Sequence, residues 1–561
     1  LPLTPNGKLD RRALPDPDFT GEASTYRPPV TANETLLCDL FALITGTERV
    51  GLDDSFFAIG GHSLLAMRLI AQLRQETGCD LPLRALFAEP TPGALAIHLD
   101  TLSADQTPAL TAGMGRLDDG VVALSYGQRR LWTLDQLDGT SSTYNIPVAM
   151  RLQGALNVEA LQLSICAILA RHEALRTIIV QDANGHPVGR LLPTPDTQTC
   201  LLFTDLSALD AHLAESRAQE LVALEAAKPF NLSHDLSFRA ALIRLSGSDS
   251  RAGASNSEHL LSLTIHHQAG DGVSMEVLAS ELTQAYAAFC NGQTPDWAPL
   301  AVQYSDWAAW QQACFEQDEH AQHSLSAKLA RAKTRLADMP ELLTLPTDYP
   351  RTPERARRAA VVPFSLPADT TLRLEQLAQK CNTTLFTVLI AAYGATLARL
   401  ANQDRVVIGS PVAGRTRVET EALVGFLVNT LALPVTLSPS LTGQELIEQT
   451  RISVQDALID QDLPFERLVD DLGVTRSLSH TPVFQAMLAF QSQGSPELDL
   501  QDIEWSIEAT AQTQVKCDLT LGIGQNDLGE LAGNLEFDAD LYDESTVKVW
   551  LDTFKRILEQ F

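Results

Sequence analysis

The sequence predicts a multidomain protein in which a small four-helix bundle precedes a larger mixed α/β part. The chain has 561 residues, which is too long for one ordinary core. Residues 30–102 carry apolar side chains at helical spacing, and from residue 121 onward strand-like and helix-like runs alternate. Residues 1–29 and 103–120 lack an apolar period and are rich in proline, charged or small residues, so they are predicted to be linkers.

Composition narrows the function classes. A hydrophobic content of 45% and a charged content of 20% are typical of globular proteins. The net charge of −29 argues against nucleic acid and anionic membranes as partners. No apolar run is long enough to span a bilayer and no secretory signal opens the sequence, so we expect a cytoplasmic protein. The eight cysteines are scattered without a CxxC pair, and we expect reduced thiols and no metal site.

The bundle is predicted from helical runs at residues 31–45, 60–78 and 81–99. Ser63 lies at the expected start of the second helix, directly after a break at Gly60 and Gly61. A phosphate ester on Ser63 would lie beside free N–H groups and the positive end of the helix dipole. Taken alone, the same serine could simply cap the helix.

The larger part is predicted to form two lobes, residues 121–295 and 296–561, each long enough for its own core. In the first lobe we expect strands at 145–154, 173–182 and 259–267 and helices at 157–172 and 274–289. In the second we expect strands at 361–367 and 404–412 and helices at 371–380 and 384–400. The basic run RTPERARR at 351–358 is predicted to be a solvated loop.

Two adjacent histidines, His266 and His267, end the strand predicted at 259–267, and Asp271 and Gly272 follow. Successive side chains on a strand point to opposite faces, so only one histidine can face a given site. Divergent histidines chelate a metal poorly, and no further ligand cluster is near in sequence. Taken alone, the pattern would also fit two core histidines followed by an Asp-Gly turn.

Residues 30–102, and above all DDSFFAIGGHSLLAMRL, resemble the peptidyl carrier domains of non-ribosomal peptide synthetases. The resemblance implies that Ser63 carries 4′-phosphopantetheine, attached by a phosphopantetheinyl transferase, and that His62 is an exposed neighbour. LPLTPNGKLDRRALP at the start resembles the last motif of an adenylation domain, with Lys8 at the position of the family's catalytic lysine. This implies an upstream adenylation domain as a partner, and Lys8 is given no role here.

Residues 121–561 resemble a condensation domain of the same synthetases, through LSYGQRRLWTLDQL, RHEALRT, HHQAGDG, YSDWAAWQ, IGSPVAGRT and LVGFLVNTL in the family's order. The first motif has Gly127 where alanine is more usual. The resemblance implies two chloramphenicol-acetyltransferase-like lobes in a V with a tunnel between them. It further implies amide bond formation between an aminoacyl or peptidyl thioester and an amine on a downstream acceptor carrier domain.

The resemblance also implies roles for individual residues of the site. His267 is expected to face the tunnel, as a base or as an orienting group, and His266 to point into the lobe, held by a hydrogen bond. Asp271 is expected to pair with Arg415, with Arg129 as the second candidate. Gly272 is expected to allow close approach of the backbone to substrate or to a neighbouring strand. Cys517 lies in QVKCDLTLGI where KFDL is commoner, which leaves a smaller side chain.

The sequence also indicates a donor subtype, and two alternatives to the main interpretation stay open. TLDQLDGTSSTYNIP resembles the subtype that accepts an L-configured or achiral donor, called LCL. Epimerisation and dual epimerisation-condensation domains share the histidine motif, although the first motif here favours simple condensation. Non-catalytic modules that recruit partner enzymes resemble condensation domains whose HHxxxDG is degraded, whereas here it is intact.

Overall fold

The computed structural model describes residues 26–561 apart from 62, 80, 82–84, 87–88, 103–107, 119, 140, 246–256, 317–318, 354, 475–476, 478, 492–499, 501–502, 509–513 and 527. The chain divides into two compact units, Leu1–Gln106 with Thr416–Val418, and Thr107–Arg415 with Glu419–Phe561. The expectations for Lys8 and His62 therefore lie outside the described residues.

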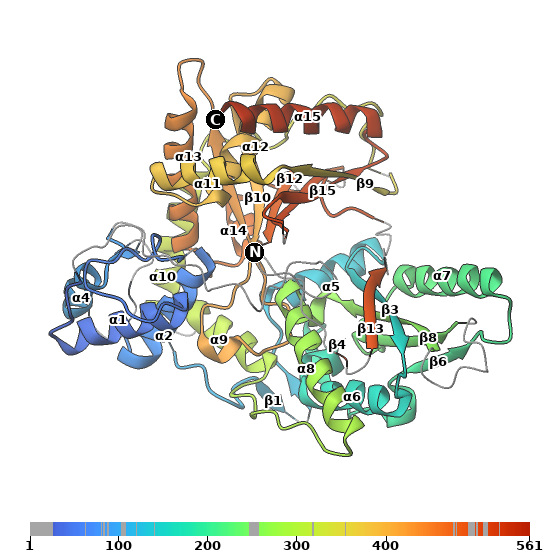
Figure 1. Cartoon of the computed structure of the whole chain (residues 1–561). Coiled ribbons are helices and arrows are strands. Elements are labelled where there is room, and N and C mark those ends of the chain that lie inside the picture. Colours follow the sequence, from blue (N-terminus) through green and yellow to red (C-terminus); the bar gives the residue numbers. More distant parts are fainter. Residues whose placement is uncertain are drawn as a thin grey trace, which may run out of the picture. The chain divides into compact units, whose positions relative to one another are not determined.

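The smaller unit contains helices α1 (Ala32–Thr45), α2 (Ser63–Thr77) and α4 (Pro92–Thr101) (Figure 1). Helix α1 begins with a capping box between Thr31 and Glu34 and ends at Gly46, whose φ of 71° is left-handed. Of the apolar positions at helical spacing, Leu37, Leu40, Phe41, Leu69 and Leu73 are buried, whereas Leu36 and Leu65 are half-buried. The predicted helical bundle is confirmed.

The first lobe of the larger unit contains a five-stranded sheet in the order β13-β3-β8-β7-β6. Its strands are β3 (Asn145–Gly154), β6 (Leu202–Asp205), β7 (Phe238–Arg244), β8 (Ser257–His266) and β13 (Ile503–Glu508). Helices α6 (Val158–Arg171) and α8 (Gly272–Cys290) pack on one face, and α7 (Ala211–Ala227) packs on the other. A smaller sheet joins β1 (Arg116–Asp118), β2 (Val121–Val122), β5 (Pro187–Leu191) and β4 (Thr177–Gln181), in that order.

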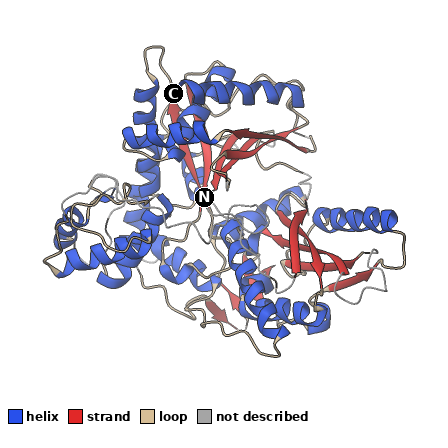
Figure 2. Cartoon of the chain, viewed as in Figure 1, coloured by secondary structure: helices blue, strands red, loops and turns tan. Residues whose placement is uncertain are grey.

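The second lobe contains a six-stranded sheet in the order β11-β10-β12-β14-β15-β9. The strands are β9 (Ala359–Leu366), β10 (Arg405–Val412), β11 (Asn429–Thr436), β12 (Ala486–Gln491), β14 (Leu519–Gln525) and β15 (Leu531–Asp538). Helices α11 (Ala368–Lys380), α12 (Leu385–Ala401), α13 (Gly443–Ile459) and α15 (Glu544–Gln560) pack on one face around an apolar core. Figure 2 shows the strands of the two lobes as separate groups, each flanked by helices.

The remaining helices are α5 (Tyr126–Asp138), α9 (Tyr304–Glu316), α10 (Glu319–Arg335) and α14 (Phe465–Leu472). Short 3-10 turns lie at Glu173–Arg176, Thr197–Thr199, His267–Ala269 and Val418–Thr420. The predicted strand at 173–182 is therefore shorter than expected, because the first of these turns occupies its beginning and β4 starts only at Thr177.

Two segments from the second half of the sequence belong to the first lobe. Strand β13 pairs antiparallel with β3, from Ile503 opposite Gly154 to Glu508 opposite Ala149. Trp307 and Ala308 of α9 are part of the first lobe's core. The lobes in space thus do not follow the cut expected at residues 295 and 296, because strand pairing joins segments that are far apart in the chain.

The described residues of the basic run at 351–358 form a loop, as predicted, and Thr352, Pro353, Ala356 and Arg358 are exposed, but Arg351 and Arg355 are not solvated. The Arg355 side chain is 5% exposed and donates from Nε to Asp538 at 2.7 Å. Arg351 pairs with Asp518 at 2.5 Å, and the Arg358 pair with Asp540 is more exposed. The prediction was wrong for these two arginines because their acidic partners lie more than 150 residues further along the chain, where a local charge pattern does not reveal them.

The expectation that all cysteines are reduced is also contradicted. Cys166 in α6 and Cys200 form a disulfide, with Cα atoms 5.8 Å apart. The free cysteines are Cys38, Cys79, Cys290, Cys314, Cys381 and Cys517. A sequence separation of 34 residues gave no local signal for the pair.

In the part of the chain that the structure describes, no single helix is both long and apolar enough to cross a membrane. The bent pair α11 and α12 passes that test by length and composition when taken together.

Candidate active site

The two histidines lie at the junction between a strand and a turn. Strand β8 ends at His266, which pairs with Asn145 of β3, and His267 begins the 3-10 turn η5 (His267–Ala269). The backbone N–H of His267 donates to the carbonyl of Tyr144 at 2.8 Å, and that of His266 to the carbonyl of Ser237 at 2.9 Å. Strand alternation therefore stops at His266, and the change of backbone at this junction sets where the second histidine lies.

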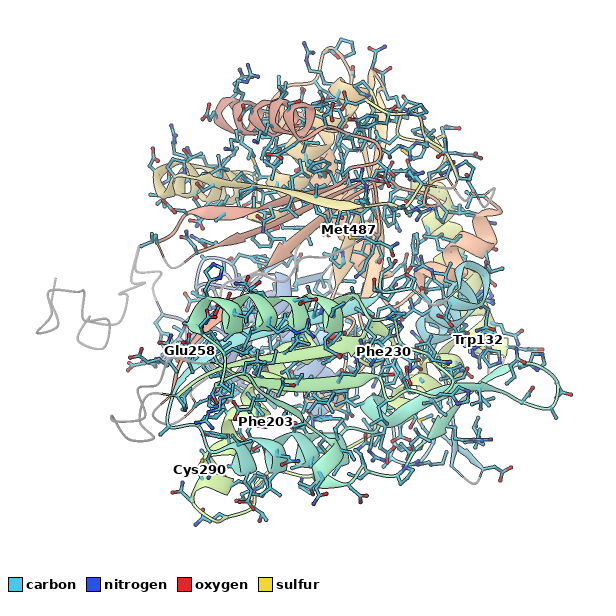
Figure 3. The ribbon with its side chains drawn as sticks, turned by 90° about the vertical axis from the view of Figure 1, so that its right-hand side faces the viewer. Trp132, Phe203, Phe230, Glu258, Cys290 and Met487 are labelled. Atoms are coloured by element: carbon cyan, nitrogen blue, oxygen red, sulfur yellow. A yellow bond between two sulfur atoms is a disulfide. The ribbon has the colours of Figure 1, made fainter. Side chains whose placement is uncertain are left out.

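His266 is buried and held from several sides. Its side chain is 5% exposed, and its Nδ1 accepts the N–H of Gln268 at 3.2 Å. Its ring meets the edges of Phe230 and Tyr144, with centroids 5.7 and 6.4 Å away; Figure 3 labels Phe230. Burial, with a smaller effect of Lys516, lowers the pKa of His266 to about 3. It is a neutral hydrogen-bond acceptor inside the lobe, as the sequence led us to expect.

His267 is half-buried and has different surroundings. Its ring meets Phe426 edge-on, with centroids 5.0 Å apart and planes at 69°. Its Nδ1 is buried and has no hydrogen-bond partner in the described part of the chain. Burial holds the pKa of His267 well below its usual value, and the charge of Lys516 acts in the same direction. The imidazole is therefore neutral at ordinary pH.

Asp271 is the centre of a buried hydrogen-bond cluster. It caps α8 by accepting the N–H and hydroxyl of Ser274 at 2.9 and 2.7 Å. Arg415 donates to both carboxylate oxygens at 3.1 Å, and the side chains of this pair are 6% and 2% exposed. The N–H groups of Leu427 and Val428 also donate to the carboxylate, each at 3.0 Å. Asp271, Ser274, Arg415, Leu427 and Val428 form what we call the Asp271 cluster.

The segment 425–428 is fixed from a second direction. Tyr304 of α9 donates its hydroxyl to the carbonyl of Phe426 at 2.9 Å. Its ring lies so close to Gly425 that a Cβ there would be 2.0 Å from it. Tyr304, Ser274 and Phe426 were not identified from the sequence. Tyr304 lies in the motif YSDWAAWQ and Phe426 in LVGFLVNTL, and Ser274 follows HHQAGDG by two residues. Their place in or beside these motifs was the only sequence feature that could have indicated a role at the site.

Gly272 and Arg129 differ from expectation. Gly272 is the exposed first residue of α8, and a Cβ there would meet no protein atom within 4 Å. Close approach to a neighbouring strand is therefore wrong, and the space beside Gly272 is open. Arg129 forms no pair with Asp271, and its Nε is buried without a hydrogen-bond partner among the described residues. Arg415 takes the role for which both arginines were candidates.

The segment 514–518 also reaches this region. The Nζ of Lys516 lies 5.9 Å from the ring centroid of Tyr144, which neighbours His266. Cys517 is 7% exposed in an apolar cluster of the second lobe, and burial raises the pKa of its thiol to about 12. The thiol is therefore protonated and inert. Nothing in the structure explains why cysteine stands here.

In the smaller unit, Ser63 is the first residue of α2. The chain enters this helix through Gly60, with a φ of +100°, and Gly61, where a Cβ would be 2.4 Å from the Phe56 ring. Both glycines are thus needed for the turn. The first turn of α2 has no acidic residue, so the site fits a phosphate ester. Among the described residues, no group of three His, Cys, Asp or Glu side chains can hold a metal ion.

Comparison with known proteins matches both units. The model of the condensation domain family covers residues 118–561, and the model named phosphopantetheine attachment site covers residues 35–99. The dimodular nonribosomal peptide synthase of Bacillus subtilis (strain 168) is 40% identical over 100% of this chain. The chain spans only 23% of the length of that synthase.

Two solved structures are also similar. The X-domain in the complex of the X-domain and OxyB from teicoplanin biosynthesis is 28% identical, with a TM-score of 0.70, covering 82% of this chain and 96% of that one. The first condensation domain of the calcium-dependent antibiotic synthetase is 20% identical, with a TM-score of 0.62 over 78% of this chain and 96% of that one, and supports the fold alone. The chain therefore belongs to the condensation domain family and carries a phosphopantetheine attachment domain ahead of its condensation domain.

Proposed function

We propose that this chain forms a peptide bond between an acyl group held on its own carrier domain and an amine held on a downstream acceptor carrier. The observation that carries the proposal is the neutral, half-buried His267 placed beside the Asp271 cluster. Ser63 is the proposed attachment point, supported by its place at the start of α2 within the matched residues 35–99. When bound, 4′-phosphopantetheine supplies a flexible arm whose thiol presents the donor as a thioester.

The residues at the site fit the needs of this reaction. The amine nitrogen bonds to the acyl carbon, the acyl C–S bond breaks, and one amine proton ends on the departing sulfur. An α-amino group has a pKa of about 7.7–8.0, so part of it is already neutral at working pH. A neutral His267 accepts a hydrogen bond from that amine, which orients it and assists removal of its proton. We assign positioning the larger part of the effect.

The partners follow from the same proposal. An adenylation domain upstream activates the donor, a phosphopantetheinyl transferase modifies Ser63, and an acceptor carrier downstream brings the amine. The substrates are aminoacyl or peptidyl thioesters, and an L-configured donor is proposed from the sequence of the first motif. A cytoplasmic location fits these partners. A tunnel between the lobes is part of this proposal.

A second candidate is a recruiting module that binds a partner enzyme without catalysis. The similarity to the X-domain solved in a complex with OxyB favours it. The intact HHQAGDG sequence and the fully bonded Asp271 favour catalysis instead. An epimerisation domain is the remaining alternative and would invert the donor's α-carbon without forming an amide.

Single-turnover condensation tests the proposal. The donor is loaded on Ser63 from aminoacyl-coenzyme A, and a panel of aminoacyl-pantetheine amines serves as acceptors. His267→Ala should lower the amide-forming rate by about 10²–10⁴ while loading is unchanged. Ser63→Ala should abolish the mass increase on loading and leave the bundle folded. His186→Ala, at a histidine with 77% side-chain exposure, is the matched control.

Three outcomes would contradict the proposal. A folded His267→Ala variant at the parental rate removes the catalytic role of His267. Phosphopantetheine on the Ser63→Ala variant removes the attachment site. An inverted donor without amide would identify an epimerisation domain, and a parent that forms no amide with any acceptor but binds a partner enzyme would support the recruiting module.

A further inference from the structure

The imidazole of His267 lacks the partner that usually orients a working histidine. In many enzymes a carboxylate holds the second ring nitrogen and fixes both the tautomer and the ring. Here no carboxylate of the described residues forms an ion pair with His267, and its Nδ1 has no hydrogen-bond partner there. Backbone groups of His267 and Gly270 lie near the ring, but none reaches Nδ1 with hydrogen-bond geometry. By contrast, Nδ1 of His266 accepts the N–H of Gln268.

An aromatic ring packs against the imidazole of His267 instead. The ring of Phe426 meets His267 edge-on at 5.0 Å, with the planes at 69°. Edge-to-face pairs of this kind are favourable and depend on angle, so one ring restricts the rotation of the other. An orienting group must itself be rigid, and the surroundings of Phe426 provide this.

Contacts of the segment 426–428 with three residues, Tyr304, Asp271 and Gly127, fix Phe426. Its carbonyl accepts the hydroxyl of Tyr304 at 2.9 Å, and the next two backbone N–H groups donate to Asp271 at 3.0 Å each. Its ring lies on Gly127 in the first turn of α5, where a Cβ would be 2.7 Å from Cε1 and 2.8 Å from Cδ1. Real Cβ atoms do not approach other atoms so closely, so alanine at 127 would force the ring to move. Glycine at this position, where alanine is more usual in the family, leaves the space that the Phe426 ring occupies.

We propose that Phe426 is a positioning residue that sets the ring orientation of His267 by apolar packing, and that Gly127 provides the space in which the Phe426 ring is held. The inference deepens the proposed function and rests on it for its kinetic consequence. It accounts for how a histidine without an acidic partner keeps one orientation. It also explains why glycine, and not the more usual alanine, stands at position 127.

The ring orientation is tested without any substrate. In the full chain labelled with ¹³C,¹⁵N-histidine, Phe426→Leu should shift or broaden the ring signals of His267 and leave those of His266 in place. Gly127→Ala should move the same His267 signals by a smaller amount. Signals are assigned by their loss in His266→Asn and His267→Asn. Because no condensation is needed, this measurement stands even if the proposed function fails.

The kinetic test uses the loaded chain and the acceptor amine that reacts fastest with the parent. Phe426→Leu should lower kcat about 10- to 100-fold with little change in the KM of the acceptor, because a misplaced imidazole costs orientation and not substrate affinity. Gly127→Ala should lower kcat by a smaller factor. In the Phe426→Leu background the effect of Gly127→Ala should disappear, because leucine lacks the ring that alanine crowds.

Matched controls separate this role from general packing. Phe203→Leu changes an exposed phenylalanine of β6, 49% exposed and labelled in Figure 3. Gly443→Ala adds a methyl group at another helix start beside a phenylalanine ring, where the nearest atom is 3.3 Å away. Neither should change the His267 signals or kcat. The proposal is overturned if folded Phe426→Leu keeps the parental His267 signals and kcat, or if Gly127→Ala and Phe426→Leu act multiplicatively.

Discussion

Two buried carboxylate clusters tie distant segments together, one beside the histidines and one in the second lobe. In the Asp271 cluster one carboxylate accepts six hydrogen bonds, from Ser274, Arg415, Leu427 and Val428. In what we call the Asp518 cluster, two carboxylates, Asp518 and Asp538, share two arginines, Arg351 and Arg355. The first cluster therefore depends on a single carboxylate paired with one arginine, whereas the second distributes its charges over two carboxylates and two arginines.

The clusters also differ in what they support. Asp271 fixes the loop that carries Phe426 and caps the helix that follows His267, so its loss reaches the site. The Asp518 cluster anchors the start of β14 and the end of β15 to the segment 351–358, within the second lobe. Two buried carboxylate clusters can therefore differ in how much they affect the reaction at His267. Mutation of one residue in each cluster tests this difference.

The largest expected effect is that of Asp271→Ala. Removing the carboxylate leaves the buried Arg415 guanidinium without its charge partner and two backbone N–H groups without an acceptor, at a cost of about 3–5 kcal/mol of unfolding free energy. Urea unfolding monitored by tryptophan fluorescence measures the loss. The folded fraction should also condense more slowly. An Asp271→Ala variant as stable as the parent would contradict the structural role of the cluster.

Arg355→Ala should cost less, about 2–4 kcal/mol, because Asp518 keeps Arg351 as a partner while Asp538 loses its pair. Its condensation rate, normalised to the folded fraction, should stay within about twofold of the parent. A rate loss as large as that of Asp271→Ala, at equal folded fraction, would mean that the two clusters do not differ in what they support.

The same two clusters show what sequence can and cannot reveal. The Asp271–Arg415 pair was expected because both residues lie in motifs whose resemblance to a family is dense and ordered. The Asp518 cluster was missed because RTPERARR has the composition of a surface loop and its partners lie far along the chain. Local patterns predicted β3, β8, α12 and the start of α2, since each depends on periodicity within about 15 residues.

Local sequence patterns could not predict contacts between segments that are distant in the chain. Phe426 and His267 are separated by 159 positions, and nothing in either neighbourhood indicates their contact. The pairing of β13 with β3 and the Cys166–Cys200 disulfide were missed for the same reason. The divergence of the two histidines was expected from strand alternation, but the strand ends between them, so the turn at His267 provides the divergence instead.

A smaller effect is expected from acid pH on His266. Its pKa is about 3 in the folded chain and about 6.5 when unfolded, so between these values the unfolded state binds more protons. Stability should therefore fall as pH drops below about 6.5, by up to about 1.4 kcal/mol per pH unit for this one group. In His266→Asn, where the amide oxygen can still accept the N–H of Gln268, the slope of unfolding free energy against pH should be lower by that amount between pH 6 and 4. The exposed His186→Asn should leave the slope unchanged, and an unchanged slope in His266→Asn would refute the neutral, buried state.

The smallest effect is expected where an ion pair lies at the surface. Lys548 and Glu544 of α15 form a pair four residues apart at 2.6 Å, with side chains 58% and 61% exposed. Their Nζ–carboxylate distance is as short as those of the buried pairs, yet water screens the charges and two long side chains lose freedom in forming it. Lys548→Ala should change the unfolding free energy by no more than about 0.5 kcal/mol, and that small difference should shrink further when salt is raised from 0.05 to 0.5 M. Asp271→Ala measured in the same salt series should keep its full cost, because its partners are shielded from solvent. If Lys548→Ala were to cost as much as Arg355→Ala, then distance and not burial would govern these pairs, and the contrast between the two buried clusters would need another explanation.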